Sequence, residues 1–343
     1  MAFDILETHE LAGVIRNFPP QSSYWLDLCF PRAHYSTTEF IDFDVVDKAR
    51  RLAPFVAPNV QGQPMLSRRE SVRKFKPAYL KPKDALDPAR VLRRMAGEGI
   101  GGSLSPQERY DAIIADTLLE QSEGIDRRLE WMACNAIVHG QVEVVGENYP
   151  SVTVGFGRRA ENTKTLAGGA RWNQPTTATP AADIEAWATE MLRRSGRRLT
   201  RVTLTPAAKT AFFATDEIKY LLETRRGSLA SAEQVNASGE VAYPVMTLPG
   251  GVQVWVYNDV YEDNDGVEVP FVEDGLVVLT GDVEGVRAFG AIMDEEANWE
   301  PMAKFPKMWP QKDPSGIFVM TQSAPLMIPG RPDASMSVNV LGA

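Results

Sequence analysis

The sequence predicts an α+β fold in which one long helix lies across a sheet. Three observations support this class: an uninterrupted amphipathic run from Pro106 to His139, strand-like stretches that gather mainly after residue 240, and a basic, proline-rich segment between them and the N-terminus. The 343 residues suffice for two or three domains with a sizeable core. The sequence therefore predicts a protein of helices and strands organised around one long helix.

The long helix has a well-marked start. Ser105 is a favourable N-cap, Pro106 occupies the first helical position and Glu108 lies in the first turn. Apolar residues recur every three or four positions, and the opposite polar stripe, including Glu130, is expected to face solvent. Gly140 is expected to follow the helix as its C-cap. Because the apolar spacing drifts from a heptad, we expect packing on a sheet rather than a coiled coil.

Residues 1–46 are expected to form an N-terminal arm. A short helical start is followed by Pro19-Pro20, which forbids helix continuation, and then by an aromatic-rich patch from Tyr24 to Phe30. A segment this interrupted cannot form its own core, so we expect it to pack on other surfaces; an ordinary N-terminal strand is the alternative. A strand is predicted from Phe40 to Val45.

Residues 47–92 are expected to form an extended basic hairpin loop. Prolines disfavour helix there, and apolar residues are too few for an independent unit. Seven cations against Glu70 give +6 between Ser67 and Lys83: Arg68, Arg69, Arg73, Lys74, Lys76, Lys81 and Lys83. We expect this loop to lie on an acidic surface. The alternative is a nucleic-acid patch, but the net charge of -9 for the whole chain disfavours it.

The remainder alternates between strands and shorter helices. A hairpin is expected at 142–145 and 152–156, helices at 183–194 and 207–213, and strands at 202–205, 241–248, 252–257, 275–279 and 289–293. The last fifty residues are expected to rejoin the sheet beside the long helix. From Asp259 to Glu300 there are thirteen acids, and Arg287 is the only base. A basic loop and an acidic module in one chain suit head-to-tail contact between copies.

Candidate catalytic and cofactor sites are weak. His9, His34 and His139 lack ligand spacing, and the glycines from Gly97 to Gly102 have no preceding strand and no phosphate-binding lysine. Cys29 and Cys134 are too few for a disulfide framework, and a buried thiol is expected at Cys134. We therefore expect neither an enzyme nor a bound cofactor or metal. No secretory signal or apolar span is visible, which predicts a soluble intracellular product.

Several phrases, taken in order, carry a family resemblance. They are Tyr79-Leu80-Lys81-Pro82-Lys83, Arg93-Arg94, Arg225-Arg226-Gly227-Ser228, Phe305-Pro306-Lys307-Met308-Trp309 and Gln322-Ser323-Ala324-Pro325-Leu326-Met327. From about residue 35 to the C-terminus, the chain resembles the lambda-type major capsid protein E family of tailed bacteriophages.

The resemblance implies the Hong Kong 97-type phage capsid fold. Its parts would be an N-terminal arm (1–46), an extended loop (47–92), a peripheral domain with the spine helix (93–180 and 296–343) and an axial domain (181–295). In this fold the extended loop lies over a neighbouring subunit, which would make the seven cations inter-subunit contacts. Some proteins with this fold crosslink a lysine to an asparagine; Lys74 or Lys81 and Asn339 are residues of those types, without further support.

The implied function is a major capsid protein that assembles as hexamers and pentamers into an icosahedral head around double-stranded DNA. The implied partners are other copies, scaffolding and portal proteins, a maturation protease and a decoration protein at three-fold axes, with no membrane and no sequence-specific DNA binding. The protein would belong to the virion and assemble in the host bacterial cytoplasm. Two alternatives are an encapsulin-like nanocompartment shell and a hydrolase using the acids between Asp259 and Glu273.

Overall fold

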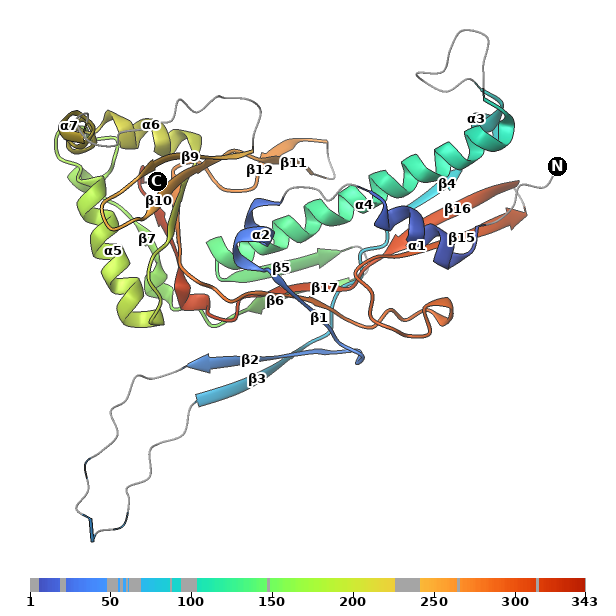
Figure 1. Cartoon of the computed structure of the whole chain (residues 1–343), viewed down its shortest axis with the longest axis horizontal. Helices are drawn as coiled ribbons and strands as arrows, with labels where there is room; N and C mark the ends of the chain where they lie inside the picture. Colours follow the sequence, from blue (N-terminus) through green and yellow to red (C-terminus); the bar gives the residue numbers. More distant parts are fainter. Residues whose placement is uncertain are drawn as a thin grey trace.

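One long helix, α4 (Pro106–Val138), connects the sheets of the molecule (Figure 1). The computed structural model describes residues 6–18, 23–47, 55, 58–59, 61, 69–86, 88–93, 104–146, 149–225, 241–263, 266–312 and 315–342. At about 1.5 Å per residue, a helix of 33 residues spans roughly 50 Å. It therefore links parts of the protein that are far apart.

Both ends of α4 are capped by side chains. At the start, the Ser105 hydroxyl accepts a hydrogen bond from the Glu108 N–H at 3.3 Å, and the Glu108 carboxylate accepts one from the Ser105 N–H at 2.6 Å. At the end, the Arg158 guanidinium donates to the carbonyls of Ile137 at 2.7 Å and Val138 at 2.8 Å. Burial lowers the Arg158 pKa to about 10. The predicted start is confirmed, and Gly140 follows the end with a φ of 69°.

The N-terminal half of α4 packs on a three-stranded antiparallel sheet. The core between them includes Ile114 and Leu118 from the helix and Met308 and Val319 from the sheet. The strand order is β15 (Phe305–Lys312), β16 (Ser315–Gln322) and β4 (Lys83–Leu86). Helices α1 (Thr8–Arg16) and α3 (Pro88–Leu92) contribute to the same cluster. The prediction that the C-terminal strands lie beside the long helix is confirmed.

The C-terminal half of α4 packs in a second, larger core. That core receives Trp25 and Phe30 from the N-terminal segment and Ile137 from α4. The elements around it are α2 (Tyr24–Cys29), the sheet β1 (Arg32–Tyr35), β14 (Val286–Phe289) and β17 (Pro325–Ile328), and the hairpin β5 (Gln141–Gly146) and β6 (Tyr149–Gly155). Segments distant in sequence thus meet at this end of the helix.

A six-stranded mixed sheet forms a third unit. Its order is β7 (Thr163–Thr165), β18 (Ser335–Asn339), β13 (Leu276–Thr280), β8 (Arg201–Leu204), β10 (Gln253–Tyr257) and β9 (Ala242–Thr247). Helices α5 (Pro180–Ser195), α6 (Pro206–Ala214) and α7 (Asp216–Arg225) pack against it around Trp187 and Phe212. Strand β18 brings the end of the chain into this sheet beside β13.

Two further strand pairs and four short 3-10 helices complete the fold. One pair is β11 (Val260–Glu262) with β12 (Glu268–Pro270), and the other is β2 (Ile41–Asp47) with β3 (Arg69–Phe75). The short helices are η1 (Ala160–Asn162), η2 (Gly168–Ala170), η3 (Glu295–Ala297) and η4 (Pro332–Ala334). In Figure 1 the β2–β3 pair extends away from the body.

The structure confirms most predicted elements and corrects two. The aromatic patch packs on the body, as expected, and forms helix α2. Pro88 begins the short helix α3 inside the segment expected to lack helices, because proline is well suited to a first helical turn. The predicted strand at 289–293 is wrong: β14 ends at Phe289, and Ala291 and Ile292 are buried in the loop that follows. Pro19-Pro20, where the first helix was expected to be interrupted, lies outside the described residues.

Candidate assembly surfaces

The β2–β3 ribbon projects away from the body of the molecule (Figure 1). Its antiparallel register places Asp42 opposite Lys74 and Asp47 opposite Arg69. Three aspartates in β2 and Glu70 give four negative charges, against the three cations of β3, so the two strands together carry 3 − 4 = −1. The basic run is therefore partly balanced by its own partner strand, which the linear sequence does not reveal.

The root of the ribbon is fixed in the core. Ile41, Phe43 and Phe75 are buried, and the rings of Phe43 and Phe156 lie 5.9 Å apart. The Tyr149 hydroxyl donates a hydrogen bond at 3.0 Å to the carbonyl of Lys76, just beyond the end of β3. The ribbon is thus held at its base, and Lys74 near that base is exposed.

The seven predicted cations do not form one cluster. Arg68 lies outside the described residues, while Arg69, Arg73 and Lys74 belong to β3. Lys76 forms an ion pair with Glu39. Lys81 and Lys83 lie on the body, over the ring of Tyr79 at 4.9 Å and over that of Phe318 at 3.8 Å, respectively. Lys81 and Lys83 are therefore cation–π partners of aromatic residues outside the ribbon.

The N-terminal segment is attached to α4 by a buried carboxylate. Glu130 is only 4% exposed, and its two oxygens accept hydrogen bonds from the N–H groups of Trp25 at 2.7 Å and Leu26 at 3.0 Å. These N–H groups lie in the first turn of α2, so Glu130 caps that helix from a different part of the chain. Burial raises the Glu130 pKa to about 7. The expectation that Glu130 faces solvent is wrong, because α2 covers it.

The acidic stretch is divided among several surfaces. Asp282 pairs with Arg197 at 3.2 Å, Glu284 with Arg331 at 2.9 Å and Asp294 with Lys307 at 3.0 Å. The ribbon β11–β12 is different: Glu262 and Glu268 are exposed and stand opposite each other. Like charges in such a pair repel, which favours a cationic partner.

No geometry in the described residues favours the hydrolase alternative. Asp259 packs beside α4, where burial raises its pKa, and its carboxylate lies 4.0 Å from the Arg127 guanidinium. Within the described part of the chain, no three or more His, Cys, Asp or Glu side chains gather in a position to hold a metal ion. Cys134 is a buried free thiol, as predicted. The Asn339 side chain accepts hydrogen bonds from the N–H groups of Leu341 at 3.2 Å and Gly342 at 2.9 Å.

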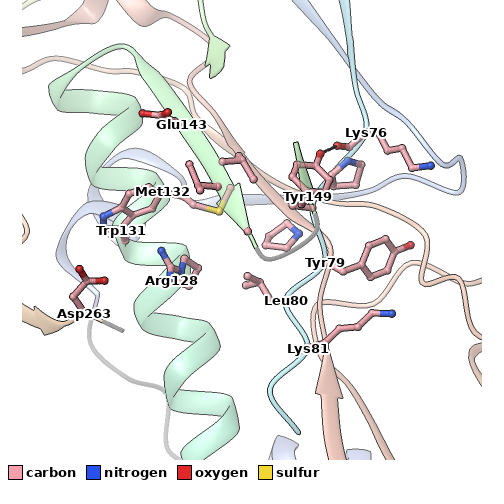
Figure 2. A pocket seen from close by; sticks show the side chains of 16 residues that line it. Lys76, Tyr79, Leu80, Lys81, Arg128, Trp131, Met132, Glu143, Tyr149 and Asp263 are labelled. Carbon is pink, nitrogen blue, oxygen red and sulfur yellow. Dashed lines mark hydrogen bonds between the residues drawn. The ribbon is translucent and has the colours of Figure 1, made fainter. Parts of the chain in front are cut away.

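A pocket of about 760 Å³, which we call the α4–β5 pocket, lies at the base of the ribbon. Its lining comes from residues 76–81, helix α4, the β5–β6 hairpin, Asp263 and Pro325. In Figure 2, Arg128 and Met132 lie on the side of α4 that faces Leu80 and Tyr149, and Trp131 of the same helix also lines the pocket. The pocket could not be predicted from the sequence, because its walls are distant in sequence.

A second surface was also missed, the loop of residues 291–301, which we call the Trp299 loop. It is closed by a bridge between Ala291 and Pro301 and by the Ile292 N–H, which donates to the Glu300 carbonyl at 3.2 Å. Trp299 is 62% exposed and Met293 is 49% exposed. The only sign of this surface in the sequence is the presence of one apolar residue, Met293, and one aromatic residue, Trp299, among acidic residues.

The same overall architecture occurs in phage capsid structures. The structure matches the crystal structure of a prophage protein from Escherichia coli CFT073, assigned as a capsid protein, with a TM-score of 0.76 and 27% identity over 98% of this chain and 99% of that one. It also matches the capsid structure of cyanophage P-SCSP1u with a TM-score of 0.52 and 10% identity over 95% of this chain and 90% of that one. The fold is therefore the Hong Kong 97-type phage capsid fold.

Sequence comparison identifies the family within that class. The model of the family "Phage major capsid protein E" matches residues 7–340, so the chain belongs to this family. The major capsid protein of Escherichia phage lambda is 32% identical over 323 residues, covering 92% of this chain and 93% of the relative. That of Enterobacteria phage P21 is 28% identical over 346 residues, covering 98% and 99%. Within the described part of the chain, no helix combines the length and apolar character needed to cross a membrane.

Proposed function

We propose that this chain is the major head subunit of a tailed bacteriophage, and that its copies assemble as hexamers and pentamers into an icosahedral shell around double-stranded DNA. The observation that carries the proposal is the family match over residues 7–340. The match to the prophage capsid structure along almost the whole of both chains supports it. The nanocompartment alternative lacks comparable support, since the relatives named above are phage capsid proteins.

The proposed parts are an N-terminal arm (1–46), an extended loop (47–92), a peripheral domain (93–180 with 296–343) and an axial domain (181–295). The role is structural rather than catalytic and needs no cofactor. The net charge of -9 supports enclosure of DNA without tight binding, because a shell that neutralised many phosphates would retain the genome. Scaffolding, portal, maturation-protease and decoration proteins are proposed partners. The shell would be part of the virion and assemble in the bacterial cytoplasm.

We further propose that the extended loop, with Arg68, Arg69, Arg73, Lys74, Lys76, Lys81 and Lys83, contacts a neighbouring subunit. Two strands without a covering layer are marginally stable in water, so the β2–β3 ribbon gains most from an external surface. From 41 to 75 the sequence has seven cations and four acids, 7 − 4 = +3. We propose that the acidic β11–β12 ribbon of a neighbour, with Glu262 opposite Glu268, receives this charge.

Charge reversal tests this contact. The variant in which Arg68, Arg69, Arg73 and Lys74 become glutamate should sediment at the size of the unassembled subunit, while the parent chain forms capsomers or shells visible by negative-stain imaging. Interfaces of obligate assemblies bury on the order of 2,000–5,000 Å², so removing one charged contact should act on assembly rather than on the subunit core. Circular dichroism and urea unfolding of the unassembled subunits should be nearly unchanged.

Reversal of the partner acids provides the matched control. Adding Glu262→Lys and Glu268→Lys to the loop variant restores opposite charges across the contact and should recover assembly. Normal particles from the loop variant alone would contradict the proposed loop contact. If the parent chain formed neither capsomers nor shells, even with its scaffolding protein, the capsid function itself would be wrong.

A further inference from the structure

We propose that the Trp299 loop of one copy binds in the α4–β5 pocket of a second copy. This inference rests on the proposed function and identifies one contact that would hold neighbouring subunits together. The loop presents two exposed apolar side chains, and the pocket offers an open cavity with apolar and cationic walls. The inferred partner is thus another copy of this chain.

The backbone of the loop adopts an unusual conformation at Trp299. Asn298 has a φ of 50° and Trp299 a φ of 55°, so two consecutive residues adopt the left-handed conformation. That conformation is sterically unfavourable for a bulky side chain and is found where surrounding contacts enforce it, often at binding sites. Tryptophan and methionine are also enriched in protein interfaces, and tryptophan is a frequent energetic hot spot.

Side-chain contacts hold the loop in this shape. The Asp294 carboxylate accepts hydrogen bonds from Lys307 Nζ at 3.0 Å, Gln322 Nε2 at 3.1 Å and the Glu296 N–H at 3.1 Å. At the start of the loop, the Ala291 carbonyl accepts a hydrogen bond from the Tyr79 hydroxyl at 2.6 Å. Little conformational freedom remains to be lost on binding, which favours affinity.

The pocket complements the loop in size and chemistry. Leu80, Trp131 and Met132 provide apolar walls, and Val145 at its edge is 71% exposed. Its volume of about 760 Å³ lies within the range of roughly 300–1,000 Å³ that accommodates large side-chain groups or ligands.

Charge adds to this match. The lining contains the cations Lys76, Lys81 and Arg128 and the acids Glu143 and Asp263, and Lys76 is already paired with Glu39 outside the lining. The Trp299 loop has no cation and four acids, which are Asp294, Glu295, Glu296 and Glu300. The cations Lys81 and Arg128 of the lining therefore offer positive charge to an acidic loop, which favours their approach.

Loop and pocket are adjacent but distinct surfaces of one copy. Tyr79 lines the pocket and also hydrogen-bonds the loop, so a single residue joins them. A contact between two different surfaces is head-to-tail, and repetition of such a contact closes into a ring when the rotation between copies allows it. This arrangement suits the ring-shaped clusters of a closed shell.

Disulfide trapping tests the contact while leaving Trp299 intact. Asn298→Cys and Val145→Cys are combined in one chain, and assembled particles are oxidised and resolved on a denaturing gel. The native thiols, Cys29 and Cys134, are buried and give a low background. We expect covalent dimers and larger ladders from particles, but not from the unassembled subunit or from either single variant. Particles of normal form without such ladders, or a link only within one chain, would overturn the contact and leave the capsid function standing.

Trp299→Ala provides the second test. A hot-spot side chain should raise the subunit concentration needed for assembly by about 30-fold or more. Trp299→Phe, which keeps an aromatic ring, should recover part of the loss. Urea unfolding of the unassembled subunits should be the same for all three proteins. An unchanged assembly threshold in Trp299→Ala would contradict the contact; absence of particles from the parent chain would instead contradict the proposed function on which it rests.

Discussion

The buried carboxylate of Glu130 gives a quantitative prediction about stability and pH. Its ordinary pKa of 4.5 is raised to about 7 in the folded protein, chiefly by burial, although the N–H groups of Trp25 and Leu26 oppose the shift. A folded-state pKa above the unfolded value means that the folded chain binds more protons between about pH 4.5 and 7. The contribution of Glu130 to the free energy of unfolding is therefore largest below that window and falls as pH rises through it.

The magnitude follows from the shift. A difference of about 2.5 pKa units corresponds to about 3 kcal/mol, most of which is lost between pH 5 and 8. Glu130→Gln removes the titrating proton and keeps an oxygen that can accept one of the two N–H groups. We expect the free energy of unfolding of the variant, minus that of the parent, to increase by about 2–3 kcal/mol from pH 5 to pH 8. Loss of the second hydrogen bond shifts the whole difference by about 1 kcal/mol without changing its slope.

Urea unfolding of the unassembled subunit at a series of pH values measures this difference directly. Glu120→Gln, at an exposed position of the same helix, is the reference for removing a carboxylate that α2 does not cover. The reasoning is refuted if the difference in the free energy of unfolding between the parent and Glu130→Gln stays constant from pH 5 to 8. It is also refuted if Glu130→Gln is the more stable protein at pH 5 and the two curves converge as pH rises.

Two further substitutions test other joints around α4. Arg158→Met removes two partly buried hydrogen bonds to the last carbonyls of the helix and should lower the free energy of unfolding by about 2–3 kcal/mol in urea. A change below about 0.5 kcal/mol would show that water caps the helix equally well. Gly285→Ala would place a Cβ atom 2.3 Å from the Cys29 carbonyl oxygen, so we expect destabilisation of at least about 1–3 kcal/mol. Its control is Gly13→Ala in helix α1, where an added Cβ would meet no atom within 4 Å apart from the chain neighbours and the backbone of the helix itself. A gain of up to about 1 kcal/mol is expected there; equal effects at the two glycines would contradict the steric argument.

Local signals made α4 predictable, whereas its surroundings depended on distant contacts. The Ser105 cap, Pro106 and the apolar spacing are all encoded within the helix, and the structure begins it at the predicted residue. Glu130 belongs to the polar stripe by sequence, but α2, about one hundred residues earlier, covers it and supplies its hydrogen-bond donors. No window of sequence around residue 130 contains that information.

The charged segments show the same limit. The basic run could be counted, but its antiparallel register with β2, which places Asp42 opposite Lys74, follows only from the fold. The stretch from Asp259 to Glu300 looked like one acidic module, yet ion pairs to Arg197, Lys307 and Arg331 divide it among separate places. Apolar character at 289–293 likewise indicated the burial of Phe289, Ala291 and Ile292 correctly but not the exposure of Met293, and it indicated a strand beyond Phe289 incorrectly, since a buried loop and a buried strand share that composition.

The distribution of the cores suggests how folding and assembly are separated in this protein. The large apolar clusters surround α4 and the six-stranded sheet, and among the ribbon side chains whose burial is described, those of Ile41, Phe43 and Phe75 at its root contribute to them. Substitutions beyond that root should therefore leave the unfolding of the subunit nearly unchanged. Under the proposed loop contact, their energetic effect is expected in assembly, where a neighbouring copy would cover the ribbon. A subunit built in this way can be stable before assembly, and contacts that form only in the shell then stabilise it further.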